Sequence, residues 1–220
     1  MLSKLVTKIE YGGNITGFLG WTNTTNNATI SIPYGCSVNR NVGRIPYIFN
    51  TSAASSAATV LSGNISLKNV IIPEGATNFG SYSMNHNLNR VVLPSTLTGS
   101  ISGVFTNCRN LKAINIPSGP TSLPNNFLQY CFSLEKIVFP NTIETFGNSL
   151  CAYCTSLKSI TLPTNLTTIG TNVFQYCNSL ETITLPNTIT SLGNYTFSNC
   201  HKLQNVNIPT SLTTLGNYVF

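Results

Sequence analysis

The sequence predicts a mainly β solenoid in which short parallel strands stack from coil to coil at a 23-residue period. The main observation is a series of prolines 23 residues apart, each preceded by the same apolar pattern. A second is composition: only 7% of the 220 residues are charged, against about 25% in an average soluble domain. Asn, Thr and Ser must therefore supply most of the polar surface. The prolines of the series are Pro94, Pro117, Pro140, Pro163, Pro186 and Pro209.

Before each proline the sequence predicts a short strand. Position −6 relative to the proline is Leu, position −3 is β-branched, and position −1 is apolar. Such alternation is typical of a strand with one buried side, and proline ends the strand because it has no N–H to donate to a ladder. Pro73, 21 residues before Pro94, carries the same pattern, so we expect about seven coils in residues 63–220.

After each proline a second apolar pattern completes the coil. Apolar residues recur at +3 and +6, glycine is frequent at +7, and a large apolar residue follows near +11, as in Leu166, Ile169, Gly170 and Phe174. Glycine at +7 suits a tight turn or a positive φ angle, and we expect the residues after it to form one short helical turn. Position +14 is cysteine in five coils, namely Cys108, Cys131, Cys154, Cys177 and Cys200.

The complete unit, P-x-x-[LI]-x-x-[IL]-G-x-x-x-F-x-x-C-x-x-L-x-x-[IV]-x-[LI], resembles the BspA-like, Treponema-type leucine-rich repeats. The resemblance covers about residues 64–220. It implies a leucine-rich-repeat solenoid of right-handed coils with a parallel sheet on the concave face. It also implies a surface adhesin that binds other molecules without catalysis.

Residues 1–62 do not follow the period, and we expect them to form an irregular, β-rich N-terminal cap or attachment segment. The lysines near Met1 are not followed by an apolar stretch, so the numbered chain is predicted to have no signal peptide. No stretch approaches the ~20 apolar residues of a membrane span. Phe220 falls at position +11, halfway round a coil, so we expect either a truncated chain or a partner that covers the end.

The residue types argue against catalysis and against a metal or cofactor site. Asp is absent, and His86 and His201 lie five coils apart. The pair Cys151 and Cys154 could be a redox dithiol or half of a zinc site. However, Cys154 belongs to the periodic cysteines, Cys151 occupies the aromatic +11 position, and no second pair completes four ligands. We therefore predict buried free thiols and no enzyme activity.

The net charge of +6 comes from scarce acids, with 11 Lys and Arg against 5 Glu. The basic residues are scattered, so no nucleic-acid partner is expected. At position −5, Lys112, Glu135, Lys158 and Glu181 alternate in sign on successive coils. This alternation predicts a ladder of surface ion pairs between neighbouring strands.

The candidate binding site is the outward side of the predicted strands, at positions −4 and −2. Its N-terminal coils are more apolar, with Val92 and Val138, whereas its C-terminal coils present hydroxyls and amides. These groups could hydrogen-bond a protein or glycan ligand, and they could equally keep an exposed sheet soluble. The candidate residues are Arg90, Asn115, Lys136, Ser159, Thr161, Thr182, Thr184, Asn205 and Asn207.

Two functional hypotheses remain. The first is a recognition or adhesion module that binds protein or glycan through the concave sheet. The second is a structural component of a large assembly, such as a phage fibre or decoration protein, attached through residues 1–62 or the uncapped C-terminal coil. Homo-oligomerisation is expected under the second hypothesis, and the location stays open between a cell surface and a virion.

Overall fold

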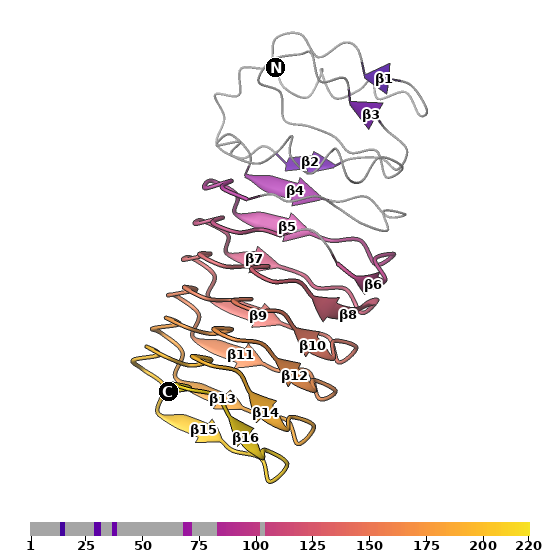
Figure 1. Ribbon diagram of the computed structural model, residues 1–220. Coiled ribbons are helices and arrows are strands. Elements are labelled where there is room, and N and C mark those ends of the chain that lie inside the picture. Colours follow the sequence, from indigo (N-terminus) through magenta and orange to yellow (C-terminus); the bar gives the residue numbers. More distant parts are fainter. Residues whose placement is uncertain (1–13, 16–28, 32–36, 39–67, 72–82, 102–103) are drawn as a thin grey trace.

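The computed structural model describes residues 14–15, 29–31, 37–38, 68–71, 83–101 and 104–220. Over these residues the chain is a solenoid of short parallel strands without any helix, as Figure 1 shows. The predicted solenoid is therefore confirmed. Most of residues 1–62 lies outside the described part, apart from three short strands, so the predicted domain boundary stays a prediction. These strands are β1 (Asn14–Ile15), β2 (Thr29–Ser31) and β3 (Ser37–Val38).

The strands that precede the prolines line one side of the solenoid, which we call the first face. Strands that pair with one another are parallel and in register, so that Ser159 pairs with Lys136 and Thr161 with Val138. The middle residue points inward, as the −3 pattern predicts, and Ile137 is buried between exposed neighbours. The strands are β4 (Asn69–Ile71), β5 (Arg90–Val92), β7 (Ala113–Ile114), β9 (Lys136–Val138), β11 (Ser159–Thr161), β13 (Thr182–Thr184) and β15 (Asn205–Asn207).

A second parallel sheet, which the sequence did not predict, runs beside the first and forms the second face. Its residues at +6, such as Phe146 and Ile169, point into the core, and those at +5, such as Thr168, point out. Most of these strands are too short for alternation to reveal them in a sequence. They are β6 (Gly99–Ser100), β8 (Pro120–Leu123), β10 (Thr145–Phe146), β12 (Thr168–Ile169), β14 (Ser191–Leu192) and β16 (Thr214–Leu215).

Stacked turns, and not the predicted helical turn, close each coil on the remaining side. Asn126 and Tyr130 have φ angles of 60° and 62°. The N–H groups of Asn126, Leu128 and Tyr130 donate to carbonyls of the next coil, at 2.9, 2.7 and 2.9 Å. Because alternate N–H groups bond between coils, a helix, which would bond within one coil, does not form.

Glycine at +7 is required by close contact between coils, and not by a positive φ angle as the sequence suggested. A Cβ atom on Gly193 would lie 2.5 Å from the carbonyl oxygen of Gly170 and 2.9 Å from the nitrogen of Thr171. A Cβ atom on Gly147 would lie 2.5 Å from the nitrogen of Asn125. These backbone atoms cannot move aside without shifting a coil.

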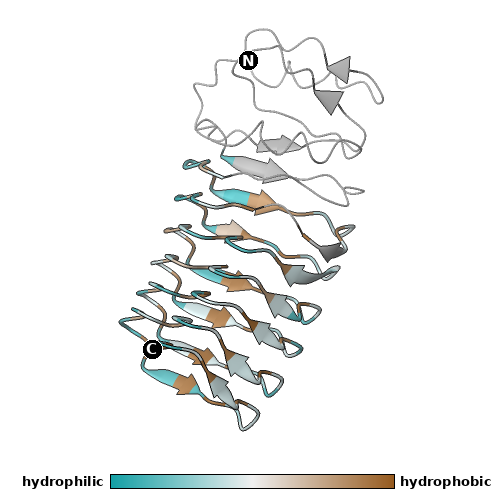
Figure 2. Ribbon diagram, viewed as in Figure 1, coloured by the Kyte–Doolittle hydropathy of each residue, from teal (hydrophilic) through white to brown (hydrophobic). Residues whose placement is uncertain are grey.

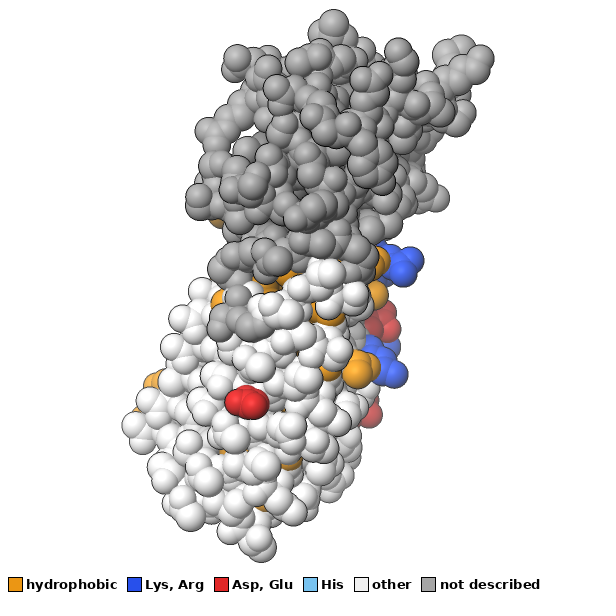
Figure 3. Space-filling view, turned by 90° about the vertical axis from the view of Figure 1, so that its right-hand side faces the viewer, with side chains coloured by type: hydrophobic (Ala, Val, Ile, Leu, Met, Phe, Trp, Pro, Cys, Tyr) orange, Lys and Arg blue, Asp and Glu red, His pale blue; other side chains and the backbone are white. Residues whose placement is uncertain are grey.

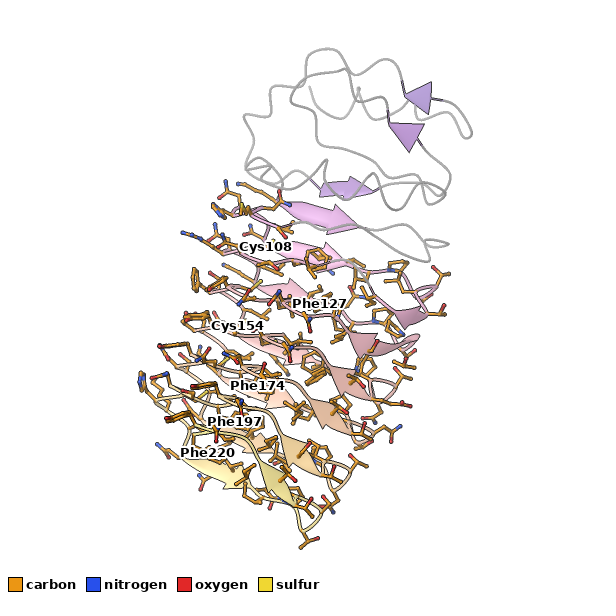
Figure 4. All side chains as sticks on the ribbon, in the orientation of Figure 1. Cys108, Phe127, Cys154, Phe174, Phe197 and Phe220 are labelled. Carbon is orange, nitrogen blue, oxygen red and sulfur yellow. The ribbon has the colours of Figure 1, made fainter. Side chains whose placement is uncertain are left out.

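Apolar side chains fill the interior as rows along the solenoid axis. Figure 2 shows hydrophobic positions recurring at the same place in successive strands. Phe174, Phe197 and Phe220 lie one above another at +11 (Figure 4), with ring centroids 5.6 and 5.7 Å apart and rings within 14° of parallel. Stacked burial of this kind is what a single coil cannot achieve alone.

This row is interrupted at Cys151, where a phenylalanine from another position packs in its place. Phe146, at +6, lies edge-on to Phe174 at 6.3 Å and contacts Phe139 at 4.6 Å. The corresponding +6 residue of the next coil is the smaller Ile169. A small side chain at one position of a coil is therefore compensated by a large side chain at another position of the same coil, so that the core stays filled.

We expect Gly193→Ala to destabilise the protein by about 1–3 kcal/mol, the usual cost of overpacking, because its Cβ would meet the backbone of Gly170. Thr190→Ala, an exposed change in the same coil, is the control and should stay within about 0.5 kcal/mol. Urea unfolding followed by circular dichroism measures both. Equal stability of the two variants would contradict the close contact.

We expect Cys151→Phe to destabilise the protein by about 1–3 kcal/mol through overpacking, and Phe146→Leu to destabilise it by leaving a cavity. The double variant should be more stable than the sum of the two effects predicts, because the new ring occupies volume vacated by Phe146. A double-mutant cycle on the free energy of unfolding measures this coupling. Strict additivity would show that the two positions do not share volume.

Candidate functional site

Eight of the nine candidate side chains project from strands of the first face, and all eight are exposed. Register aligns Lys136, Ser159, Thr182 and Asn205 in one column, since each pairs with the next. Neighbours in a column are about 4.8 Å apart, the spacing of adjacent strands. A second column contains Thr161, Thr184 and Asn207.

The hydroxyl and amide groups of these columns face solvent. Within the described residues, no hydrogen bond engages the side chains of Ser159, Thr161, Thr182, Thr184, Asn205 or Asn207. Their donors and acceptors are held on a hydrogen-bonded ladder and are free to bind. Such an array can exchange hydrogen bonds with peptide groups or sugar hydroxyls.

Asn115 is the exception among the nine. Its strand ends at Ile114, and its side chain turns to the neighbouring coil. Asn115 Oδ1 accepts a hydrogen bond from the Leu93 nitrogen at 2.8 Å, and its Nδ2 donates to the Leu93 oxygen at 3.0 Å. The side-chain amide therefore extends the ladder in place of backbone, and our binding proposal rests on the other eight residues.

The hydrogen-bonded sheet of the first face is interrupted next to Asn115, between β7 and β9. β2, β4, β5 and β7 form one sheet, and β9, β11, β13 and β15 form another, without a hydrogen-bonded ladder between β7 and β9. The two sheets nevertheless follow one another along the solenoid in Figure 1. Arg90 lies on one side of this division, and Lys136 lies on the other.

Charge on the first face is only partly paired. Lys158 Nζ lies 3.3 Å from Glu135 Oε2, with both side chains more than 60% exposed. Among the described residues, this is the one ion pair of the predicted ladder. Lys112 and Glu181 have no ion-pair partner in that part of the chain. An exposed pair contributes about 0.2–1 kcal/mol at most.

The periodic cysteines form an internal ladder. The thiols of Cys131, Cys154 and Cys177 each donate to a backbone carbonyl 26 residues earlier, at 3.3 Å, and Cys200 does so at 3.1 Å. All six cysteines in the described part of the chain are free, and all but Cys200, which is partly buried, are buried as predicted. Asn85 occupies the same position in an earlier coil and is fully buried.

The buried thiols resist deprotonation. Burial raises the pKa of Cys108 to about 12 and that of Cys200 to about 11, from an ordinary value of 9.0. Burial also raises the pKa of Cys151 well above its ordinary value. Since the thiolate is the nucleophile and the metal ligand, neither activity is favoured near pH 7. No group of three or more His, Cys, Asp or Glu that could hold a metal occurs in the described residues.

Known proteins resemble this chain over most of its repeats. The family model for the BspA type leucine rich repeat region matches residues 58–181 and 121–220. A leucine-rich repeat protein from Bacteroides ovatus is 25% identical over 70% of this chain, with a TM-score of 0.65. One from T. pallidum is 28% identical over 68%, with a TM-score of 0.63.

This chain spans 41% of the Bacteroides ovatus protein and 73% of the T. pallidum protein. No curated protein matches it. A membrane-spanning helix is not found among the described residues.

The cysteine ladder predicts alkaline instability. Because burial favours the neutral thiol, the stability linked to these groups is present below pH 9 and is lost as the pH rises toward the folded pKa values of about 11 and 12. Burial also raises the pKa of Cys131 and of Cys177 well above 9.0. We therefore expect the melting temperature to fall more steeply above pH 9 in the wild type than in Cys131→Ser/Cys177→Ser, which lacks these two buried thiols. Melting curves at several pH values test this, and parallel pH profiles would contradict it.

Proposed function

We propose that this chain, which belongs to the BspA-type leucine-rich repeat family, is a non-enzymatic recognition or adhesion module. The ligand is a protein or a glycan, and it binds on the first face. The observation that carries this proposal is the pair of exposed polar columns on β9, β11, β13 and β15, whose hydroxyls and amides have no partner among the described residues.

Rigidity supports this assignment. The columns stand on a four-stranded ladder in which β11 and β13 are paired on both sides, and threonine has few side-chain rotamers. Binding therefore costs little conformational entropy, which favours affinity at a given contact area. Neutral donors and acceptors also suit ligands rich in hydroxyl or amide groups.

Hydroxyls in the turns that lead into the second face join neighbouring coils. The Thr167 hydroxyl donates to the oxygen of Glu144 at 3.1 Å, and the Thr213 hydroxyl donates to that of Thr190 at 3.2 Å. Ser211 similarly donates to the oxygen of Ile189 at 2.7 Å. These hydroxyls are therefore committed to the fold. The outward residues Thr168 and Thr214 on the second face are exposed, and this face provides the comparison surface for the binding test.

The alternative function is a structural part of a larger assembly, such as a phage fibre or decoration protein. Residues 1–62, one proposed attachment segment, lie mostly outside the described part. The other is the C-terminal coil, where Leu215, Tyr218 and Phe220 are 57%, 70% and 61% exposed. These side chains offer a surface on which a partner could stack. Light scattering distinguishes a monomer, expected for a separate recognition module, from an oligomer.

We expect Thr161→Glu/Asn205→Glu to weaken ligand binding at least about tenfold, or about 1.4 kcal/mol, by placing two charges on the polar columns. Thr168→Glu/Thr214→Glu is the matched control, because it places the same two charges two coils apart on the second face. Arrays of immobilised glycans and peptides identify the ligand, and its affinity is then measured for each variant. Equal effects of the two pairs, or an array without any bound ligand, would contradict the proposal.

A further inference from the structure

We propose that the N-terminal part of the first face binds an extended acidic polypeptide segment that also carries apolar side chains. This inference rests on the proposed function and names the class of partner. The surface concerned, which we call the basic–apolar patch, has the same order of residues in two strands. Arg90 and Val92 are the outward residues of β5, and Lys136 and Val138 are those of β9. Lys112 lies at the entrance to the strand between them.

The cations of this patch lack anionic partners. Glu135, the acidic residue next to Lys136 in the chain, is already paired with Lys158 at 3.3 Å. Within the described residues, Arg90, Lys112 and Lys136 have neither an ion pair nor a hydrogen bond from their charged groups. Arg90 and Lys136 lie two coils apart, with Lys112 on the coil between them, so an anionic ligand would reduce the repulsion among these like charges as well as add attraction.

Apolar side chains accompany these cations. Val138 is 55% exposed, and Val92 is partly exposed. Figure 3 shows Lys and Arg side chains along one edge of the described surface, with hydrophobic and acidic side chains between them, whereas the side toward the viewer is almost entirely neutral and polar. Charge and apolar area therefore occur together, and a partner must match both.

The spacing of the patch suits an extended chain. Arg90 and Lys136 belong to strands two coils apart, or about 10 Å at the usual strand spacing. Between them Ala113 presents only a methyl group, and the Asn115 amide is held by Leu93. A polypeptide in the extended polyproline II conformation has three residues per turn and rises about 3.1 Å per residue. Acidic residues three apart therefore lie on the same side of the chain and reach both cations, while an intervening apolar residue contacts the valines. An anionic polysaccharide would satisfy the cations but leave the valines without apolar side chains to bury.

A fluorescent peptide of repeating Glu-Leu-Ser tests this proposal, with peptides of repeating Glu-Ser-Ser and Lys-Leu-Ser as controls. We expect only Glu-Leu-Ser to bind well, with an affinity that falls as salt is raised. Arg90→Gln/Lys136→Gln should weaken binding at least about tenfold, and Val138→Ser about threefold. Thr168→Glu/Thr214→Glu lowers the net charge by the same two units on the second face and should change affinity less than about twofold. Melting curves confirm that each variant is folded.

Each other outcome overturns part of the proposal. Equal binding of Glu-Leu-Ser and Glu-Ser-Ser, with heparin competing and Val138→Ser without effect, would identify an anionic polysaccharide site. Equal losses in the patch variant and the second-face control would mean that net charge alone drives binding. Failure of the peptide to bind at all would remove this partner class. In that case the first face remains a binding site if the double variant Thr161→Glu/Asn205→Glu abolishes binding of the array ligand. Both proposals fail if this double variant also binds the array ligand as the wild type does.

Discussion

The spacing between successive coils is the constraint on which the rest of the structure depends. Parallel strands must lie about 4.8 Å apart to form hydrogen bonds, and here two sheets and a row of turns share that spacing in each coil. At the +7 position this leaves no room for a Cβ atom, because the carbonyl oxygen of Gly170 would lie 2.5 Å from a Cβ on Gly193. The backbone of the adjacent coil therefore requires glycine at the +7 position.

The same spacing explains backbone conformations that would be unfavourable in isolation. Tyr130, Tyr153 and Tyr176 have φ angles of 62°, 64° and 59°, a region that costs a residue with a side chain about 1–2 kcal/mol. In return, their N–H groups donate to the next coil at 2.7–2.9 Å. The rings of Tyr153 and Tyr176 stack with centroids 4.5 Å apart, and the ring of Tyr130 lies tilted against that of Tyr153 at 4.7 Å. Asparagine, which adopts this conformation more readily, occupies the position in two other coils, at Asn107 and Asn199.

Repetition also separates the parts of the molecule that maintain the fold from those free to recognise a ligand. Cysteine thiols, aromatic rows and hydroxyls in the turns before the second face, such as that of Thr167, are engaged with neighbouring coils. The outward residues of the first face are largely unengaged, and they change along the axis from Arg90 and Val92 to Asn205 and Asn207. Variation is therefore tolerated where it does not disturb stacking, and this is where differences in binding specificity can accumulate.

The sequence by itself determined the period, the strands before each proline and the inward cysteines, because those features repeat in residue type as well as spacing. It also placed Lys136, Ser159, Thr182 and Asn205 on one side, since a 23-residue offset repeats the same strand position. Tertiary structure decided the second sheet, whose strands are mostly too short to show alternation. It decided the positive φ angles at residues other than glycine, because only bonds to another coil favour them. It also engaged Asn115 with Leu93 and interrupted the ladder between β7 and β9. Of the predicted ion-pair ladder, it formed the pair of Glu135 and Lys158 among the described residues. These features depend on contacts between coils, which no single repeat contains.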